Sequence, residues 1–155
     1  MKIEKVIYDL NEDLQNKVVD IVNEVLEEAL QELKATAPVD TGYYKESMKI
    51  EKAVKRGNII KGKVYNDNIV ATTSGKEYVL GELLEHGTVP HMIYPVNSPR
   101  LHFQINGKEI YATKVSHPGT IPQPHWQPVY EKSKIKLERM LKTYERWCSE
   151  EIKWN

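Results

Sequence analysis

Cysteine and phenylalanine are nearly absent from this 155-residue chain, which contains one of each, Cys148 and Phe103. A single cysteine cannot form an internal disulfide, and such a chain suits a reducing compartment. Cys148 also lies on the apolar stripe that we predict for the last helix, where a buried thiol behaves as a small hydrophobic side chain. The sequence therefore excludes a disulfide-stabilised fold and does not favour thiol chemistry.

Net charge and long apolar runs are also missing. Lys plus Arg equals Asp plus Glu at 22 each, so the chain has no general electrostatic attraction to nucleic acid or to an anionic membrane. No stretch approaches the roughly 18 apolar residues that cross a bilayer, and charged residues interrupt the first ten positions. We therefore expect neither a signal peptide nor a membrane anchor.

The charges that are present are unevenly distributed. Residues 1–32 contain nine acids and three lysines, whereas residues 45–63 contain seven bases and two glutamates. Such segregation is usual for solvated faces, and it also suits subunits that meet through oppositely charged ends. The hydrophobic fraction of 40% is ordinary for a globular protein, so residues 1–155 are expected to form a single domain.

Two helices enclose the predicted fold. The first spans residues 11–35, where apolar residues recur at spacings of three and four. It is followed by Pro38, which cannot continue a helix. The second helix spans residues 129–150 and has the same periodicity. Before it, residues 117–128 contain four prolines, which predict irregular backbone.

The region between the helices, residues 45–115, is predicted to contain a central antiparallel sheet of hairpins. One hairpin pairs residues 48–52 with residues 60–65 across a turn at Gly57, and its outer face is basic. The other hairpin turns at Asn106-Gly107, the strongest short hairpin signal. These strands and the two helices assign the chain to the α+β class.

Two connecting segments are less regular. Residues 66–76 are rich in Asn, Asp, Thr, Ser and Gly, and they are predicted to form a surface loop. Residues 78–85 are apolar enough for a short helix or a strand, and the pattern does not decide between the two. Gly87 ends this element in either case.

Five histidines raise the question of a metal or catalytic site, and all fall in the middle of the chain: His86, His91, His102, His117 and His125. Zinc sites draw ligands from compact pairs such as Cys-x-x-Cys or His-x-x-x-His, neither of which occurs. His91 and His117 are instead expected to hydrogen-bond loop backbone. Glu85 and His86 are neighbours whose side chains point apart, and no serine lies in a Gly-x-Ser-x-Gly context. The sequence predicts no catalytic residue, metal or cofactor.

Three ordered segments carry a more specific signal. They are Ala37-Pro-Val-Asp-Thr-Gly42 continued to Met48, Tyr78 through Glu85-His86-Gly87-Thr88 to Phe103, and His117-Pro-Gly-Thr-Ile-Pro-Gln-Pro124 continued to Glu131. Together they resemble the head-to-tail connection family of long-tailed bacteriophages, which includes neck, minor tail and tail-completion proteins. The chain departs from the family pattern at Tyr44, Lys45, Met48, His86, His125 and Gln127.

The resemblance implies a non-enzymatic structural subunit of a phage or prophage connector, neck or tail-completion (terminator) component. Its partners would be further copies of itself in a homo-oligomeric ring and neighbouring head or tail proteins. Membrane contact is not implied, and DNA would at most pass through the ring or touch it nonspecifically. The subunit would be located in the virion, and in the host bacterial cytoplasm during assembly.

The resemblance also implies roles for particular residues. The positions expected to fix structural corners are Pro38, Asp40, Thr41, Gly42, Gly87, Thr88, Pro118, Gly119, Thr120 and Pro124. The residues expected to contribute interface contacts are Tyr43, Tyr44 and Trp126, and Tyr78 and Phe103 are candidates for core or contact anchors. Aromatic residues of this kind are favoured at protein contacts.

Two other functions stay open from the residues alone. One is a small metal-dependent hydrolase that uses the clustered histidines. The other is a DNA-binding accessory protein that uses the basic segment from Lys45 to Lys63. This segment lacks the interleaved aromatic residues that stack on single-stranded bases.

Overall fold

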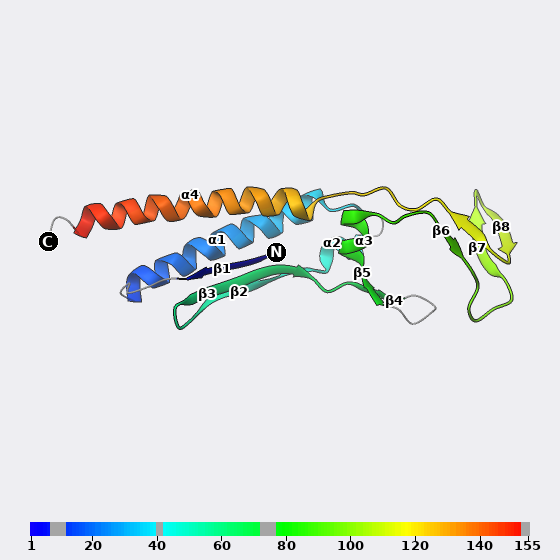
Figure 1. Cartoon of the computed structure of the whole chain (residues 1–155), viewed down its shortest axis with the longest axis horizontal. Helices are drawn as coiled ribbons and strands as arrows, with labels where there is room; N and C mark the ends of the chain where they lie inside the picture. The colour runs from blue at the N-terminus through cyan, green and yellow to red at the C-terminus, as the bar shows by residue number, and fades with distance from the viewer. Residues whose placement is uncertain (7–11, 40–41, 72–76, 153–155) are drawn as a thin grey trace. The chain divides into compact units, whose positions relative to one another are not determined.

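The computed structural model describes residues 1–6, 12–39, 42–71 and 77–152. It contains two compact units, which are residues 1–67 with 125–155 (unit 1) and residues 68–124 (unit 2). Long helices dominate unit 1 and short strands dominate unit 2 (Figure 1). The α+β class, with a long N-terminal helix, antiparallel hairpins and a C-terminal helix, is confirmed. The single-domain organisation stays a prediction.

Helix α1 (Glu12–Thr36) lies within one residue of its predicted bounds. Acidic residues in its first turn and Lys34 in its last turn favour the helix dipole. Its apolar stripe forms the centre of unit 1, and each member is at most 6% exposed: Val18, Ile21, Val22, Val25, Leu26, Ala29 and Leu33. Burial of these side chains on one face is the main force that holds the helix in place.

A three-stranded antiparallel sheet packs against α1 (Figure 1). Its strands, in spatial order, are β1 (Lys2–Val6), β3 (Ile59–Asn66) and β2 (Met48–Arg56). The predicted first hairpin is therefore confirmed, but β2 continues beyond Lys52. A β-bulge between Glu51 and Val54 lets the strand continue. At the bulge the Ala53 amide donates to Asn23 Oδ1 of α1 at 2.7 Å. The amide therefore keeps a hydrogen-bond partner although the bulge interrupts the pairing of the strands.

The sheet has one apolar face and one polar face. Met48, Ile60 and Val64 are at most 3% exposed, and they alternate with exposed residues along β2 and β3. This period of two is the pattern of a strand that is buried on one side. The short helix α2 (Tyr43–Glu46) precedes β2, and Gly42 with φ 84° stands at its start.

Helix α4 (Trp126–Ile152) packs along α1 in the opposite direction. It begins three residues before the predicted start, so the irregular segment ends earlier than expected. Proline is tolerated in the first helical turn because amides there have no intrahelical acceptor, and Pro128 therefore does not delay the helix. Val129, Ser133 and Leu141 are buried. None of the helices in the described ranges is long and apolar enough to cross a membrane.

The described part of unit 2 contains helix α3 (Leu80–His86) and strands that pair two by two. The pairs are β4 (Ile69–Ala71) with β5 (Glu77–Val79), β6 (His91–Ile93) with β9 (Val115–His117), and β7 (Leu101–Ile105) with β8 (Lys108–Ala112). The β7–β8 hairpin is confirmed. Asn106 and Gly107 both have positive φ, 50° and 75°, as a type I′ turn requires.

Two expectations for unit 2 need correction. The predicted loop at residues 66–76 contains β4, because the β-branched pair Ile69-Val70 pairs with β5. The undecided segment at residues 78–85 is neither all helix nor all strand. Its first two residues end β5, and α3 begins at Leu80. Gly87, with φ 66°, follows the helix as predicted.

Unit 2 buries very little. Gly81 is the only buried residue among those of unit 2 whose burial is described, whereas large apolar side chains such as Val89 and Ile121 are 78% and 83% exposed. Two-stranded hairpins are marginally stable in water unless a third strand or another element covers them. The described residues of unit 2 therefore lack an apolar core of their own.

Candidate assembly surfaces

Two of the predicted corner motifs meet in unit 2. The Thr88 amide donates to the Thr120 carbonyl oxygen at 3.0 Å, and the Thr120 amide donates to the Thr88 carbonyl oxygen at 3.1 Å. The Thr120 amide also lies 3.0 Å from Thr88 Oγ1. We call Gly87, Thr88, Gly119 and Thr120 the Gly-Thr clasp. It joins residues 32 positions apart in the sequence.

The clasp requires glycine at two positions. Gly87 and Gly119 have φ values of 66° and 88°, which side chains disfavour. A Cβ atom on Gly87 would lie 2.3 Å from the Thr120 carbonyl oxygen, and one on Gly119 would lie 2.2 Å from the Thr88 carbonyl oxygen. Both obstacles are backbone atoms that form the clasp, so they cannot move aside while it stays closed.

The clasp closes the base of residues 89–118, which we call the arm. The arm contains the β6–β9 and β7–β8 pairs, and none of its residues is buried. Its large exposed apolar side chains are Val89, Met92, Ile93, Tyr94, Val96, Ile105 and Tyr111. Clusters of exposed apolar residues on a soluble protein commonly mark interaction sites. The arm is therefore a candidate assembly surface.

The histidines of the arm make local contacts. His91 Nδ1 lies 2.9 Å from the Val89 carbonyl oxygen, and the Gly119 amide donates to His117 Nδ1 at 3.1 Å. These are the expected contacts with loop backbone. His102 stacks on Tyr111 and contacts Glu109, and hydrogen bonds from Gln104 and His102 lower the pKa of the Glu109 carboxyl. Over the described ranges, no group of three or more His, Cys, Asp or Glu side chains could hold a metal ion.

In unit 1, the first corner motif meets the end of the proline-rich segment. The Trp126 indole donates to the Tyr44 hydroxyl oxygen at 2.8 Å, and this hydroxyl lies 2.7 Å from His125 Nε2. The hydroxyl oxygen can accept from two donors and give one proton, so the direction of its hydrogen bond with His125 follows the tautomer of the imidazole ring. Asn66 reaches the same place, donating to the Tyr44 carbonyl oxygen at 3.2 Å. Three separate chain segments are tied together here.

The structure places the three aromatic interface candidates differently. Tyr43 is 70% exposed, Trp126 is half-buried, and Tyr44 is only 6% exposed. Of the other corner residues in unit 1, Pro38 is half-buried and Asp40 and Thr41 lie outside the described residues. In unit 2, Pro118 and Pro124 are exposed. The interface role of Tyr43, Tyr44 and Trp126 stays a prediction.

Replacing Tyr44 by phenylalanine is expected to lower the free energy of unfolding by roughly 1–3 kcal/mol, since it breaks both hydrogen bonds of a buried hydroxyl. Urea unfolding followed by tryptophan fluorescence measures the change. Tyr130→Phe is the matched control, because Tyr130 is 37% exposed, and its cost should stay within about 0.5 kcal/mol. Equal costs for the two variants would contradict a structural role for the hydroxyl.

The outer face of the sheet is basic, as predicted. Lys49, Arg56, Lys61 and Lys63 are exposed or half-exposed, and Lys63 pairs with Glu51 at 3.0 Å and lies 4.6 Å from the centre of the Tyr65 ring. Salt bridges on such a surface contribute little to stability. This face is a second candidate surface for contact with another molecule.

Sequence comparison links these features to a phage protein family. Residues 2–87 match the family model HK97-gp10_like, described as "Bacteriophage HK97-gp10, putative tail-component". The matched range includes β1, α1, the first corner motif and Gly87 of the clasp. No curated protein and no solved structure matches the chain.

Proposed function

The chain belongs to the HK97-gp10-like family of bacteriophage tail components, and from this premise we propose that it is a subunit of the head-to-tail connector. As a tail component it has a structural role in the virion and contacts other phage proteins. In the proposed role, copies assemble into a ring in the host cytoplasm, and the ring joins or completes the tail as a neck or terminator component.

The observation that carries this proposal is the exposed arm. A segment without buried residues, closed at its base by the clasp, gains stability when it lies against another protein. In the proposed ring, the arm of one copy contacts a different surface of the next copy, and such a contact is heterologous. Heterologous contacts that close produce rings.

Neither alternative function gains support from the side chains. His91, His117 and His125 each bond to a neighbouring group within the chain, so the clustered histidines are better explained as local structural contacts than as a hydrolase site. The basic sheet face has apolar neighbours such as Ile59 and Val54, and it is as suited to a protein partner as to nucleic acid.

The test replaces two exposed loop residues of the arm, Tyr94→Ser with Val96→Ser, which are 58% and 55% exposed. Both lie outside the strands, so the hairpins should stay formed. We expect the wild-type chain to form a discrete oligomer larger than a dimer, and the arm variant to need at least a tenfold higher concentration to reach the same mass. Light scattering across a concentration series measures this.

Val39→Ser with Ile135→Ser is the control, since it removes two apolar side chains of unit 1 that are 68% and 65% exposed. Its assembly should match that of the wild type. The same proteins are then used to recover purified head and tail proteins. A wild-type chain that stays monomeric and recovers none of them would overturn the proposal.

A further inference from the structure

An apolar groove of about 690 Å³ runs between α1 and α4. Its floor is formed by Leu14, Ile21, Met140, Tyr144 and Trp147. The Trp147 ring stacks on Tyr144 with 5.8 Å between centroids, yet the residue is 51% exposed. Burial, followed by the effects of Cys148 and Asp13, raises the pKa of Tyr144 to about 12, so the groove floor carries no charge near neutral pH.

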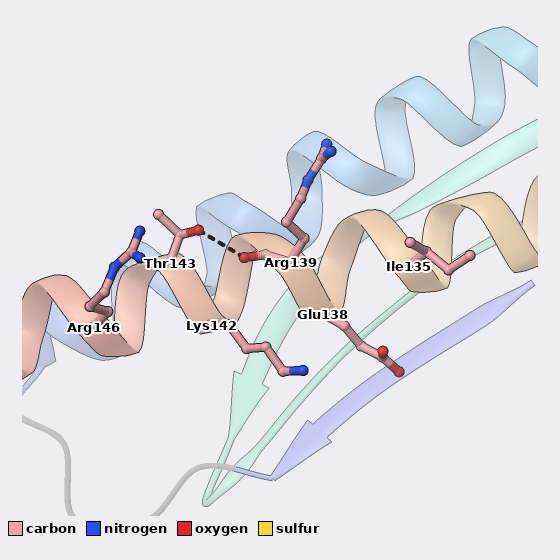
Figure 2. Close-up of a pocket in the computed structure, with 6 residues that line it drawn as sticks. All are labelled: Ile135, Glu138, Arg139, Lys142, Thr143 and Arg146. Carbon is pink, nitrogen blue, oxygen red and sulfur yellow. Dashed lines mark hydrogen bonds between the residues drawn. The ribbon is translucent and has the colours of Figure 1, made fainter.

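The two rims of the groove differ in charge. The α1 rim includes Asp13 and Glu24, with the exposed Asp20 one helical turn before Glu24. The α4 rim includes Arg139. Figure 2 shows Arg146 on the same side of α4 as Arg139, whereas Lys142 and Glu138 point to the other side. Lys17 also lies on the acidic rim, where its long stem can turn its charge into solvent.

The ion pairs that join α1 to α4 lie toward the other end of the groove. Lys132 binds Glu32 at 2.7 Å, and Lys136 binds Glu24 at 3.3 Å and also Glu28. Within the described ranges, five charged residues of the rims form no ion pair, and they are Asp13, Lys17, Asp20, Arg139 and Arg146. With the Lys17 charge turned into solvent, two acids on the α1 rim and two bases on the α4 rim flank an open apolar floor.

The contacts between the helices fix the level of each rim charge, that is, its position along the helix axis. Tyr144 donates to the Leu14 carbonyl oxygen at 3.4 Å, and Lys136 reaches Glu24. Because the helices are antiparallel and rise about 1.5 Å per residue, Arg146 lies near the level of Asp13. By the same reasoning Arg139 lies near the level of Asp20.

We propose that the groove binds the same groove of a second copy around a two-fold axis parallel to the helices. Such a rotation leaves the position of every residue along the helix axis unchanged, and it places α1 of one copy over α4 of the other. Asp13 then faces Arg146 of the second copy, Asp20 faces Arg139, and each pair occurs twice. The floors meet, with the two Trp147 side chains at the centre of aromatic and apolar contact.

The contact extends the proposed function by naming a second mode of self-association. An isologous contact closes at two copies, so it is separate from the heterologous ring contact assigned to the arm. The resulting dimer is either the unit from which a ring assembles or the contact that joins two rings. The opposite charges also set the register, because sliding by one helical turn separates both charge pairs.

Two charge-reversal variants test the contact, and both are made in the Tyr94→Ser/Val96→Ser background so that the arm does not dominate association. One carries Arg139→Glu and Arg146→Glu. The other carries Asp13→Lys and Asp20→Lys. All four side chains are exposed, so the arginine variant should unfold at the same temperature as the background protein. Asp13→Lys puts a positive charge in the first turn of α1 and should cost only about 0.3–1 kcal/mol, so the aspartate variant should also stay folded.

Each variant alone is expected to be monomeric, with like charges facing each other in any dimer, and its dissociation constant should rise at least 100-fold. An equal mixture should restore a species of twice the 18.0 kDa chain mass, because each acidic rim then faces a basic one. Sedimentation velocity measures both. Arg56→Glu with Lys61→Glu is the control, since it makes the same charge change on the outer sheet face and should leave the dimer unchanged.

Three results would overturn the two-fold contact: variants that dimerise alone as the background does, a mixture that associates no better than its components, or a mixture that forms only larger alternating species. A background protein that is monomeric at every concentration would do the same. None of these results would overturn the ring proposal. That proposal is tested by comparing the wild type with the Tyr94→Ser/Val96→Ser variant, and the groove is unaltered in both proteins.

Discussion

Replacing Gly119 by alanine is expected to open the Gly-Thr clasp. An L-residue at φ 88° costs roughly 1–2 kcal/mol, and the new Cβ would lie 2.2 Å from the Thr88 carbonyl oxygen. The strands must separate to relieve this contact, so the two Thr88–Thr120 backbone hydrogen bonds are lost at about 0.5–1.5 kcal/mol each. The total of more than about 2 kcal/mol should make the Thr88 and Thr120 amides exchange with solvent at least 30-fold faster.

Gly107→Ala separates the effect of backbone conformation from that of the clash. Gly107 has φ 75°, but a Cβ there meets nothing within 4 Å. This variant therefore loses stability from the positive φ alone, and the clasp stays closed. Hydrogen exchange followed by NMR or mass spectrometry should show normal protection at Thr88 and Thr120. Normal protection in Gly119→Ala would mean that the clasp does not depend on the close approach of its two glycines.

The clasp marks the limit of what local patterns predicted. Sequence resemblance identified Gly87 and Gly119 as corners, and positive φ at both agrees with a conformational need for glycine. It gave no indication that the two corners meet, because a single bridge between residues 32 positions apart leaves no periodic signal. The need for glycine here comes as much from the partner carbonyl as from φ.

The helices were predicted more accurately than the strands for a physical reason. The α1 stripe repeats over 25 residues, so the period is unambiguous. Strand β4 has only three residues, too few for any alternation to appear. The start of α4 was placed too late because Pro128 was taken as a breaker, whereas a first-turn proline costs no hydrogen bond.

The aromatic residues show why surfaces are harder to predict than folds. Tyr43 and Tyr44 are neighbours of the same type, yet one is 70% and the other 6% exposed. What distinguishes them is the pair His125 and Trp126, about 80 positions away. Trp147 fits the spacing of the apolar residues in the last helix, but it lines an open groove. A stripe pattern indicates which side chains share a face, not whether that face is covered.

Replacing Leu26 by alanine is expected to produce the largest loss of stability in unit 1. Leu26 is 0% exposed and lies where α1 packs on the sheet, beside Gly62 of β3. Buried leucine-to-alanine changes cost about 2.7–5 kcal/mol, from lost transfer energy and the cavity left behind. Urea unfolding should show this as a lower midpoint with an unchanged slope. A loss below about 1 kcal/mol would contradict the tight packing of this layer.

Gly62→Ala tests the same contact from the opposite side. A Cβ on Gly62 would lie 2.6 Å from Leu26 Cδ1, and 2.8 and 2.9 Å from the Ala53 amide nitrogen and Cα. The clash with Leu26 should cost about 1–3 kcal/mol, and removing the leucine side chain should relieve it. In a double-mutant cycle, Leu26→Ala/Gly62→Ala should therefore lose at least about 1 kcal/mol less than the two single variants combined. The relief stays incomplete because the Ala53 backbone, held by Asn23 at the bulge, cannot follow. Strict additivity would show that helix and sheet do not share this packing constraint.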